Sequence, residues 1–260
     1  MLTLSEIEKN YPDNLKAYKQ FMLKEYLQHK ILQIIFDSKY ANHLSFLGDT
    51  CLRIVHGNSR FSEDLDFDNF GLKEDVFENL AKHIKNQLVQ EGYNAEMKTV
   101  YKGAYHCRIK FPKLLYQEKL SGHIEEIILI QLDTEPQHFD FTPEKFILNR
   151  FDVFTQIFTT PLDILLAQKF YTILNRERNK GRDFFDTVFI LSKIDSPNYE
   201  YLKIKADISN AEQLKKRVLE KCSKINMEAM AKDVQPFLFD PADSKKVVLF
   251  PDYLMQVNLH

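Results

Sequence analysis

The residues best suited to chemistry lie between positions 48 and 70. Four carboxylates fall within six positions there: Glu63, Asp64, Asp66 and Asp68. Apolar and acidic residues alternate over 65–71, which predicts a strand, and side chains two apart on a strand share a face. Asp64, Asp66 and Asp68 would therefore point the same way and repel one another, unless a hard divalent cation such as Mg²⁺ bound them. Acids spaced D-x-D also occur on solvated strand edges, so the motif alone leaves both interpretations open.

A phosphate-binding turn is predicted just upstream of these acids. Residues 43–48 have the pattern of a short buried strand that ends at Gly48, and residues 49–57 that of a helix. Glycine lets backbone amides approach an anion, and a helix N-terminus favours phosphate. Gly48 and the hydroxyl of Thr50 are therefore candidate phosphate-binding groups. A turn of this kind followed by D-x-D on the next strand resembles the nucleotidyltransferases of the DNA polymerase β type.

More specifically, the segment resembles the signature of the AbiEii/AbiGii toxin family of nucleotidyltransferases. Beyond the turn itself, the matching positions are Leu52, Arg53, Ile54, Arg60, Phe61, Ser62, Asp64 and Asp66. Asp49 departs from the signature, because the family usually has a second glycine there. The resemblance implies that Asp64 and Asp66 are catalytic and bind metal. It further implies that the nucleotide is bound by Gly48, Thr50, Arg60 and Ser62.

The resemblance extends to the C-terminal half and touches the chain from about residue 45 to residue 192. Lys169 lies in a predicted helix over 162–178, and Asp183 lies in an R-D-x-x-D motif at 182–186. The resemblance implies two further catalytic residues: Lys169 would offset charge on the leaving pyrophosphate, and Asp183 would orient the nucleotide or Lys169. The basic residues over 176–182 suit either phosphate binding or a solvated helix end favoured by the helix dipole.

A third carboxylate usually completes such a site from a later strand. Residues 125–133 form the most apolar predicted strand, and Asp133 stands at its carboxyl end. Asp133 is therefore a candidate metal ligand, and a simple strand-end cap is the alternative. Cys51 falls in the helix predicted over 49–57, where packing is favoured over a nucleophilic role.

The pattern of elements predicts an α+β fold. The 260 residues are 44% hydrophobic and carry a formal net charge of −2, which excludes disorder and a polycation. We expect a nucleotidyltransferase-type mixed sheet with flanking helices over 1–150 and a mainly helical domain over 151–260, with a C-terminal helical bundle. Three helices are predicted in that second domain, over 162–178, 183–193 and 209–232. The apolar run over 245–257 has a β-like pattern without an assigned place.

Other sequence features concern the compartment. Three cysteines without CxxC spacing indicate reduced thiols rather than disulfides or a zinc site. The first residues lack the pattern of a signal peptide, and no apolar run approaches the ~20 residues of a membrane span. The sequence therefore predicts a soluble, cytoplasmic protein without a membrane partner.

These residues together predict a Mg²⁺-dependent nucleotidyltransferase that moves an NMP from an NTP to an acceptor. The acceptor is a tRNA 3′ end or a protein hydroxyl. RNA is favoured by the basic segments 176–182 and 215–224, although the latter is by default a solvated helix face. The resemblance implies a toxin of a type IV toxin–antitoxin or abortive-infection system, with a cognate antitoxin encoded nearby. Two alternatives remain open: a nucleotide-binding module without transfer activity, and a metal-dependent nuclease that uses the same acids.

Overall fold

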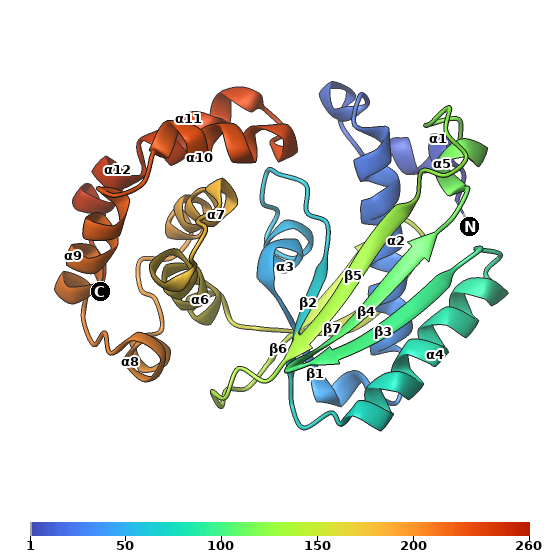
Figure 1. Cartoon of the computed structure of the whole chain (residues 1–260), viewed down its shortest axis with the longest axis horizontal. Coiled ribbons are helices and arrows are strands. Elements are labelled where there is room, and N and C mark those ends of the chain that lie inside the picture. The colour runs from blue at the N-terminus through green and yellow to red at the C-terminus, as the bar shows by residue number, and fades with distance from the viewer. Residues whose placement is uncertain (1) are drawn as a thin grey trace. The chain divides into compact units, whose positions relative to one another are not determined.

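The computed structural model describes residues 2–260 and divides the chain into two compact units (Figure 1). Unit 1 runs to His56 and resumes over Phe61–Thr160, and unit 2 comprises Gly57–Arg60 and Pro161–His260. The domain boundary predicted at residue 150 falls between two strands, β6 (Glu144–Arg150) and β7 (Val153–Thr159). Because both strands belong to the sheet of unit 1, that unit extends to Thr160.

A single mixed sheet organises the described part of unit 1. Its seven strands lie in the spatial order β3-β4-β5-β2-β1-β7-β6. The pairs β2–β5 and β1–β7 are parallel, and the other neighbours are antiparallel. This sheet with its helices confirms the expected α+β class. The remaining strands are β1 (Leu44–Leu47), β2 (Leu65–Asn69), β3 (Glu96–Lys102), β4 (Ala104–Phe111) and β5 (Ile128–Glu135).

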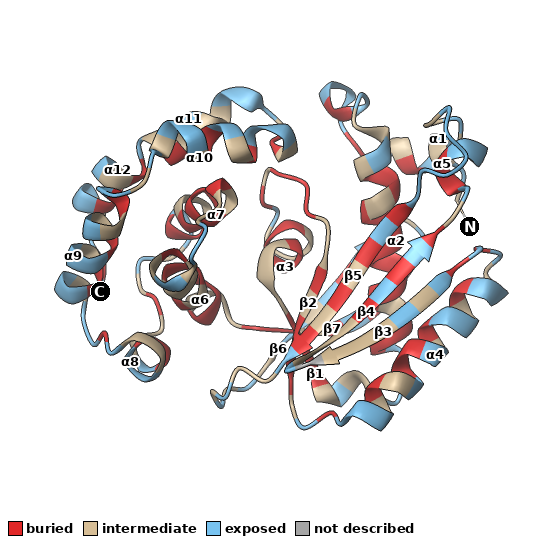
Figure 2. Ribbon diagram, viewed as in Figure 1, coloured by how far each residue is buried: buried red, intermediate tan, exposed pale blue. Residues whose placement is uncertain are grey.

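Two long helices cover one face of the sheet. The helix α2 (Lys19–Phe36) packs on β7 and β5, α4 (Glu74–Gln90) packs on β3 and β4, and the two helices contact each other (Figure 1). Phe67 of β2 contacts Phe36 of α2, with ring centroids 6.2 Å apart, and Tyr105 of β4 contacts Phe77 of α4 at 5.5 Å. Residues that alternate with Phe67 and Tyr105 therefore point to the opposite face. Figure 2 shows the resulting alternation of buried and exposed positions along β4. We call this opposite face the open face.

Short helical segments complete unit 1. These are α1 (Leu4–Glu8), α5 (Leu114–Gln117) and two 3₁₀ turns, η1 (Asp13–Leu15) and η2 (Ala41–His43). The predicted helix over 49–57 is α3 (Gly48–Ile54), which contacts β1 and β2.

A buried ion-pair cluster anchors α3 to α2. The carboxylate of Glu25 on α2 is 2% exposed and accepts from Arg53 Nε at 2.7 Å, from Arg150 at 2.8 Å and from the Tyr11 hydroxyl at 2.9 Å. Burial alone would raise the pKa of Glu25, but the guanidinium groups of Arg53 and Arg150 hold it below its ordinary value. Arg53, one of the two arginines of the signature, therefore lies in the protein interior, where it fixes the helix α3 that begins at Gly48.

Unit 2 is helical, as predicted for the C-terminal half. Its helices are α6 (Leu162–Asn175), α7 (Gly181–Leu191), α8 (Tyr199–Ala206), α9 (Ala211–Cys222), α10 (Met227–Val234), α11 (Lys245–Val248) and α12 (Phe250–Gln256), with 3₁₀ turns η3 (Gln235–Phe237) and η4 (Pro241–Ser244). The helix predicted over 209–232 is broken, because the side chain of Asn226 caps α10 by accepting from the backbone N–H of Ala229. The β-like pattern over 245–257 was also misleading, since that run forms α11 and α12. Proline occupies the first turn of α12, which suits a helix start.

The three thiols pack inside the protein. Cys51, Cys107 and Cys222 are free and buried. Burial raises the pKa of Cys107 to about 12 and that of Cys222 to about 11, and it also raises the pKa of Cys51. None of the helices described between residues 2 and 260 combines the length and the apolar character that crossing a membrane requires.

We expect His29, which lies on α2 beside the Glu25 cluster, to make stability pH dependent. Its Nδ1–H donates to the Glu25 carbonyl at 2.7 Å, and its buried Nε2 has no hydrogen-bond partner among the described residues. Burial lowers the pKa of His29 from 6.5 to about 4. Between these values the unfolded chain binds the proton and the folded chain does not. The free energy of unfolding should therefore fall by roughly 3 kcal/mol as the pH is lowered through this window.

Urea denaturation at about pH 7 and about pH 4.5 measures this effect. The His29→Gln variant keeps a donor for the Glu25 carbonyl but has no proton to bind, so it should lose less stability than wild type over the same interval. Equal losses in the two proteins would contradict the assignment.

Candidate active site

The centre of the site is a pair of carboxylates on neighbouring parallel strands. Asp66 of β2 lies directly opposite Asp133 of β5 in the strand register. Both alternate with residues that face α2 and α4, so both project from the open face. The third carboxylate expected from a later strand is therefore next to Asp66, on a strand that is distant in sequence.

Asp64 lies just before β2, rather than in the strand as its spacing predicted. Its Oδ1 accepts from the backbone N–H of Gln131 on β5 at 3.4 Å, which brings it to the same edge of the acid pair. Burial raises the pKa of Asp64; Lys24 and the Gln131 N–H oppose this, and Glu63 and Asp133 add to it. The remaining acid of the motif, Asp68, shares the face of Asp66 and accepts from the Gln137 N–H at 2.9 Å.

Two side chains that the sequence analysis did not single out hold Asp133. His106 Nδ1 lies 2.7 Å from Asp133 Oδ1, and Gln131 Nε2 donates to Asp133 Oδ2 at 2.9 Å. His106 is the register partner of Asp133 on β4. Alternation along 104–111 could have placed His106 on the open face, but the pairing of β4 with β5 is not visible in the sequence.

Gly48 adopts a positive φ of +79°, a conformation that favours glycine, while its predicted binding of phosphate stays a prediction. A Cβ added to Gly48 would lie 2.5 Å from Asp66 Oδ2 and 3.0 Å from Asp66 Cβ. Residue 48 must therefore lack a side chain for Asp66 to occupy its position. The turn and the acid are in direct contact.

Thr50 and Ser62, both predicted to bind the nucleotide, are bonded to each other in this structure. Thr50 is fully buried, its Oγ1 lies 2.8 Å from Ser62 Oγ, and its hydroxyl also bonds the backbone carbonyl of Asp64. These contacts fix the loop that carries Asp64. The bond to Thr50 suits Ser62 to supporting the D-x-D loop, and its binding of the nucleotide stays a prediction.

The acids have the chemistry of a Mg²⁺ site that needs outside ligands. Within residues 2–260, no three His, Cys, Asp or Glu side chains are close enough together to hold a metal ion by themselves. Mg²⁺ is commonly held by one or two carboxylates together with substrate phosphates and water. Two of the three acids at this edge, Asp66 together with Asp64 or with Asp133, would fit that donor set, because phosphate oxygens would supply the ligands that the protein lacks.

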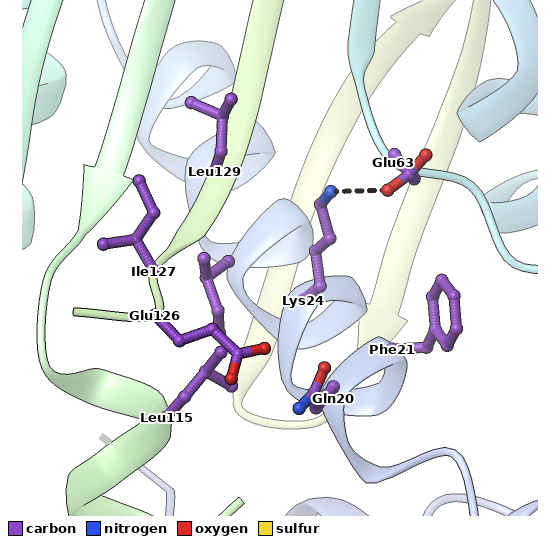
Figure 3. Close-up of a pocket in the computed structure, with 9 residues that line it drawn as sticks. Gln20, Phe21, Lys24, Glu63, Leu115, Glu126, Ile127 and Leu129 are labelled. Carbon is purple, nitrogen blue, oxygen red and sulfur yellow. Dashed lines mark hydrogen bonds and ion pairs between the residues drawn. The ribbon is translucent and has the colours of Figure 1, made fainter. Parts of the chain in front are cut away.

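A cavity of about 180 Å³ opens beside this group within unit 1 (Figure 3). Its lining includes Phe21 and Lys24 of α2, Glu63, and Leu129 of β5. Lys24 Nζ lies 3.3 Å from Glu63 Oε1, as the dashed line in Figure 3 shows. The walls of the cavity are both apolar and polar, since Gln20 and Glu126 also line it, and Glu63 immediately precedes Asp64.

In unit 2, the remaining candidates form a buried charge cluster. Lys169 Nζ lies 2.7 Å from Asp186 Oδ2 and 3.5 Å from Asp183 Oδ1. Arg176 binds Asp183 at 2.6 Å. Lys169 and Asp183 are therefore brought together, as the resemblance implies.

Arg60 belongs to the same cluster. Its guanidinium is almost fully buried and binds both oxygens of Asp186, at 2.7 and 2.6 Å, while Asn58 donates to Asp186 at 2.8 Å. Asp186 is the residue that the sequence analysis passed over, although it is the second acid of the R-D-x-x-D motif. In this structure Arg60 serves to neutralise Asp186, and its role in nucleotide binding stays a prediction.

Comparisons with known proteins identify the family and the fold. The sequence matches the family described as nucleotidyl transferase AbiEii toxin, type IV toxin–antitoxin system, over residues 30–249. It matches no curated protein significantly. The structure of JHP933 from Helicobacter pylori is similar, with a TM-score of 0.55 and 17% identity, over 90% of this chain and 91% of that one. A candidate nucleotidyltransferase from H. pylori gives a TM-score of 0.54 at 17% identity, over 93% of this chain and 99% of that one. At this identity the two structures show a shared fold.

The contact between Gly48 and Asp66 makes a prediction about stability. Gly48→Ala combines a left-handed backbone, which costs about 1–3 kcal/mol for a residue with a Cβ, with displacement of Asp66. Gly71→Ala is the matched control, because Gly71 has a φ of +75° and nothing within 4 Å of its added Cβ. Chemical denaturation should show that Gly48→Ala loses at least about 1 kcal/mol more than Gly71→Ala. Equal losses would show that residue 48 and Asp66 do not compete for space.

Proposed function

Since the chain belongs to the AbiEii nucleotidyltransferase toxin family of type IV toxin–antitoxin systems, we propose that it transfers an NMP from an NTP to an acceptor hydroxyl in a Mg²⁺-dependent reaction. The observation that carries this proposal is the register of β2 and β5, which sets Asp66 beside Asp133 on the open face, with Asp64 at the same edge. Carboxylates grouped in this way suit a divalent cation and the phosphates that accompany it.

In the proposed reaction, Asp64 and Asp66 hold Mg²⁺, which when bound neutralises charge on the triphosphate and aligns it. The acceptor oxygen forms a bond to the α-phosphorus, the bond to the β-phosphate bridge breaks, and pyrophosphate leaves. Asp133 either takes the proton of the acceptor hydroxyl or completes the metal site, in which case the proton passes to solvent water. His106 and Gln131 fix the orientation of its carboxylate for either role.

The other predicted residues keep the roles that the resemblance implies. Gly48 and Thr50 hold the β- and γ-phosphates through their backbone N–H groups at the start of α3, because the Thr50 hydroxyl is already bonded to Ser62 and to the backbone of Asp64. Ser62 supports the loop between them and Asp64. Lys169 offsets charge on the departing pyrophosphate, and Asp183 orients Lys169, a pairing that their 3.5 Å contact supports. The cavity beside Glu63 offers room for part of the nucleoside.

The acceptor that we favour is RNA, with a tRNA 3′ end as the specific candidate and a protein hydroxyl as the alternative. The proposed partner is an antitoxin encoded nearby, and the proposed outcome of transfer is growth arrest. A second candidate function is a nucleotide-binding module without transfer activity. It is favoured by Asp49, which adds a carboxylate in the first turn of α3, directly after the glycine expected to face phosphate.

A transfer assay decides between these functions. We expect purified protein with Mg²⁺ and each α-³²P-labelled NTP in turn to label tRNA or a protein of a cell extract. The Asp64→Ala/Asp66→Ala variant should lose at least about a thousand-fold of the rate, because it removes both proposed metal ligands. Glu74→Ala/Asp75→Ala, which removes two exposed carboxylates from α4, is the matched control and should behave as wild type.

The products distinguish the outcomes. Label in RNA or protein that depends on Asp64 and Asp66 supports transfer and identifies the nucleotide and acceptor class. NTP binding without label under any condition would overturn transfer in favour of the binding module. RNA that is shortened and unlabelled would identify a nuclease.

A further inference from the structure

Three basic side chains lie together on the open face of the sheet, away from the helices. They are Lys98 of β3 and Arg108 and Lys110 of β4, here called the basic strip. Lys98 lies directly opposite Arg108 in the register of β3 and β4. The neighbours Thr99 and Tyr101 bond Glu78 of α4, so the alternating residue Lys98 points away from that helix.

The register connects the basic strip to the acids. His106 lies opposite Asp133, Arg108 lies opposite Gln131, and Lys110 lies opposite Leu129. The cations therefore continue along the strands from the acid pair, two and four residues further on. Alternate residues of a strand are ~6.7 Å apart, which is on the scale of the spacing between successive phosphates of an extended nucleic acid strand.

The strip is exposed and its charge is largely unopposed. Lys98, Arg108 and Lys110 are all exposed, and no ion pair or side-chain hydrogen bond from another described residue engages them. Glu96, the register partner of Lys110, is the acid that faces the strip from β3. On the part of the open face formed by Glu96–Lys98 and Arg108–Lys110, the three cations outnumber this carboxylate. A cation that the fold leaves unpaired on a sheet face is available to a polyanion.

We propose that the basic strip binds the sugar–phosphate backbone of a single-stranded acceptor RNA and presents its terminal hydroxyl to Asp66 and Asp133. The inference rests on the proposed function for its acceptor end, and its binding surface is distinct from the basic helix segments 176–182 and 215–224. In this proposal the lysine and arginine side chains contact phosphates, so we expect binding that tolerates changes of base sequence and weakens steeply with salt.

The test compares three triple variants with wild type by fluorescence anisotropy. The probe is a fluorescein-labelled single-stranded RNA of about ten nucleotides, titrated at several salt concentrations. For Lys98→Ala/Arg108→Ala/Lys110→Ala we expect at least a tenfold loss of affinity at low salt. The slope of log K against log salt is negative, and it should become shallower by about 2, because each lost phosphate contact removes about 0.7 from its magnitude.

Two charge-matched controls remove three exposed cations elsewhere. The first control changes three lysines on or beside α4, the helix that covers the opposite face: Lys73→Ala/Lys82→Ala/Lys85→Ala. The second changes three cations on or beside α9: Lys216→Ala/Arg217→Ala/Lys224→Ala. Both should bind the probe within about twofold of wild type, with slopes changed by less than about 0.7. Losses of equal size in all three variants, a loss confined to the α9 variant, or no RNA binding by wild type would each overturn the proposal.

The transfer assay separates this inference from the proposed function. If label enters RNA equally well in wild type and in the strip variant, the strip proposal fails and the transferase proposal stands. If no protein transfers label but the strip variant alone loses RNA binding, the transferase proposal fails and the strip remains an RNA-binding surface.

Discussion

Repulsion between neighbouring carboxylates is the constraint on which the site depends. Parallel pairing of β2 with β5 sets Asp66 beside Asp133, and the N–H of Gln131 brings in Asp64. Burial already raises the pKa of Asp64, and Asp133 raises it further. Negative charges gathered at one edge of a sheet repel one another, and a divalent cation bound there would offset that repulsion.

Much of the surrounding structure serves to hold these acids in place. Gly48 leaves the space that Asp66 occupies, and Thr50 bonds the backbone of Asp64. The helix α3, which carries Gly48 and Thr50, is held to α2 by the buried ion pair of Arg53 and Glu25. The signature therefore contains two kinds of residue. Some, such as Asp66, face the open side of the sheet, and others, such as Thr50 and Arg53, hold the first kind in position. The site needs the supporting residues as much as it needs the acids.

Local patterns in the sequence predicted the parts of the site that lie close together along the chain. The alternation of apolar and acidic residues over 65–71 predicted the strand β2 and the face on which Asp66 lies. The glycine between a predicted strand and a predicted helix indicated the turn at Gly48. The hairpin of β6 and β7 was missed. Its strands are joined at Phe151, which adopts a positive φ of +59° without the glycine or asparagine that usually marks such a turn.

Long-range pairing is what the sequence could not supply. In the sequence, Asp133 is one of several polar residues at the ends of predicted strands. Only the pairing of β5 with β2 shows that it lies beside Asp66. The supporting residues His106 and Gln131, and the basic strip itself, become visible only from the register of β3, β4 and β5. Similarly, Asp186 looked like one acid of a motif, and its place between Arg60 and Lys169 depends on contacts far apart in the chain.

The central claim is that Asp66 belongs to a site that binds Mg²⁺ together with an NTP. The most direct measurement is the melting temperature of wild type and of Asp66→Asn with NTP alone, with Mg²⁺ alone and with both. A ligand at about a hundred times its Kd stabilises the folded state by about 2.7 kcal/mol, which raises Tm by several degrees for a chain of this size. We expect wild type to show this rise only when Mg²⁺ and NTP are both present, and Asp66→Asn not to show it. An equal rise in the two proteins would contradict the claim.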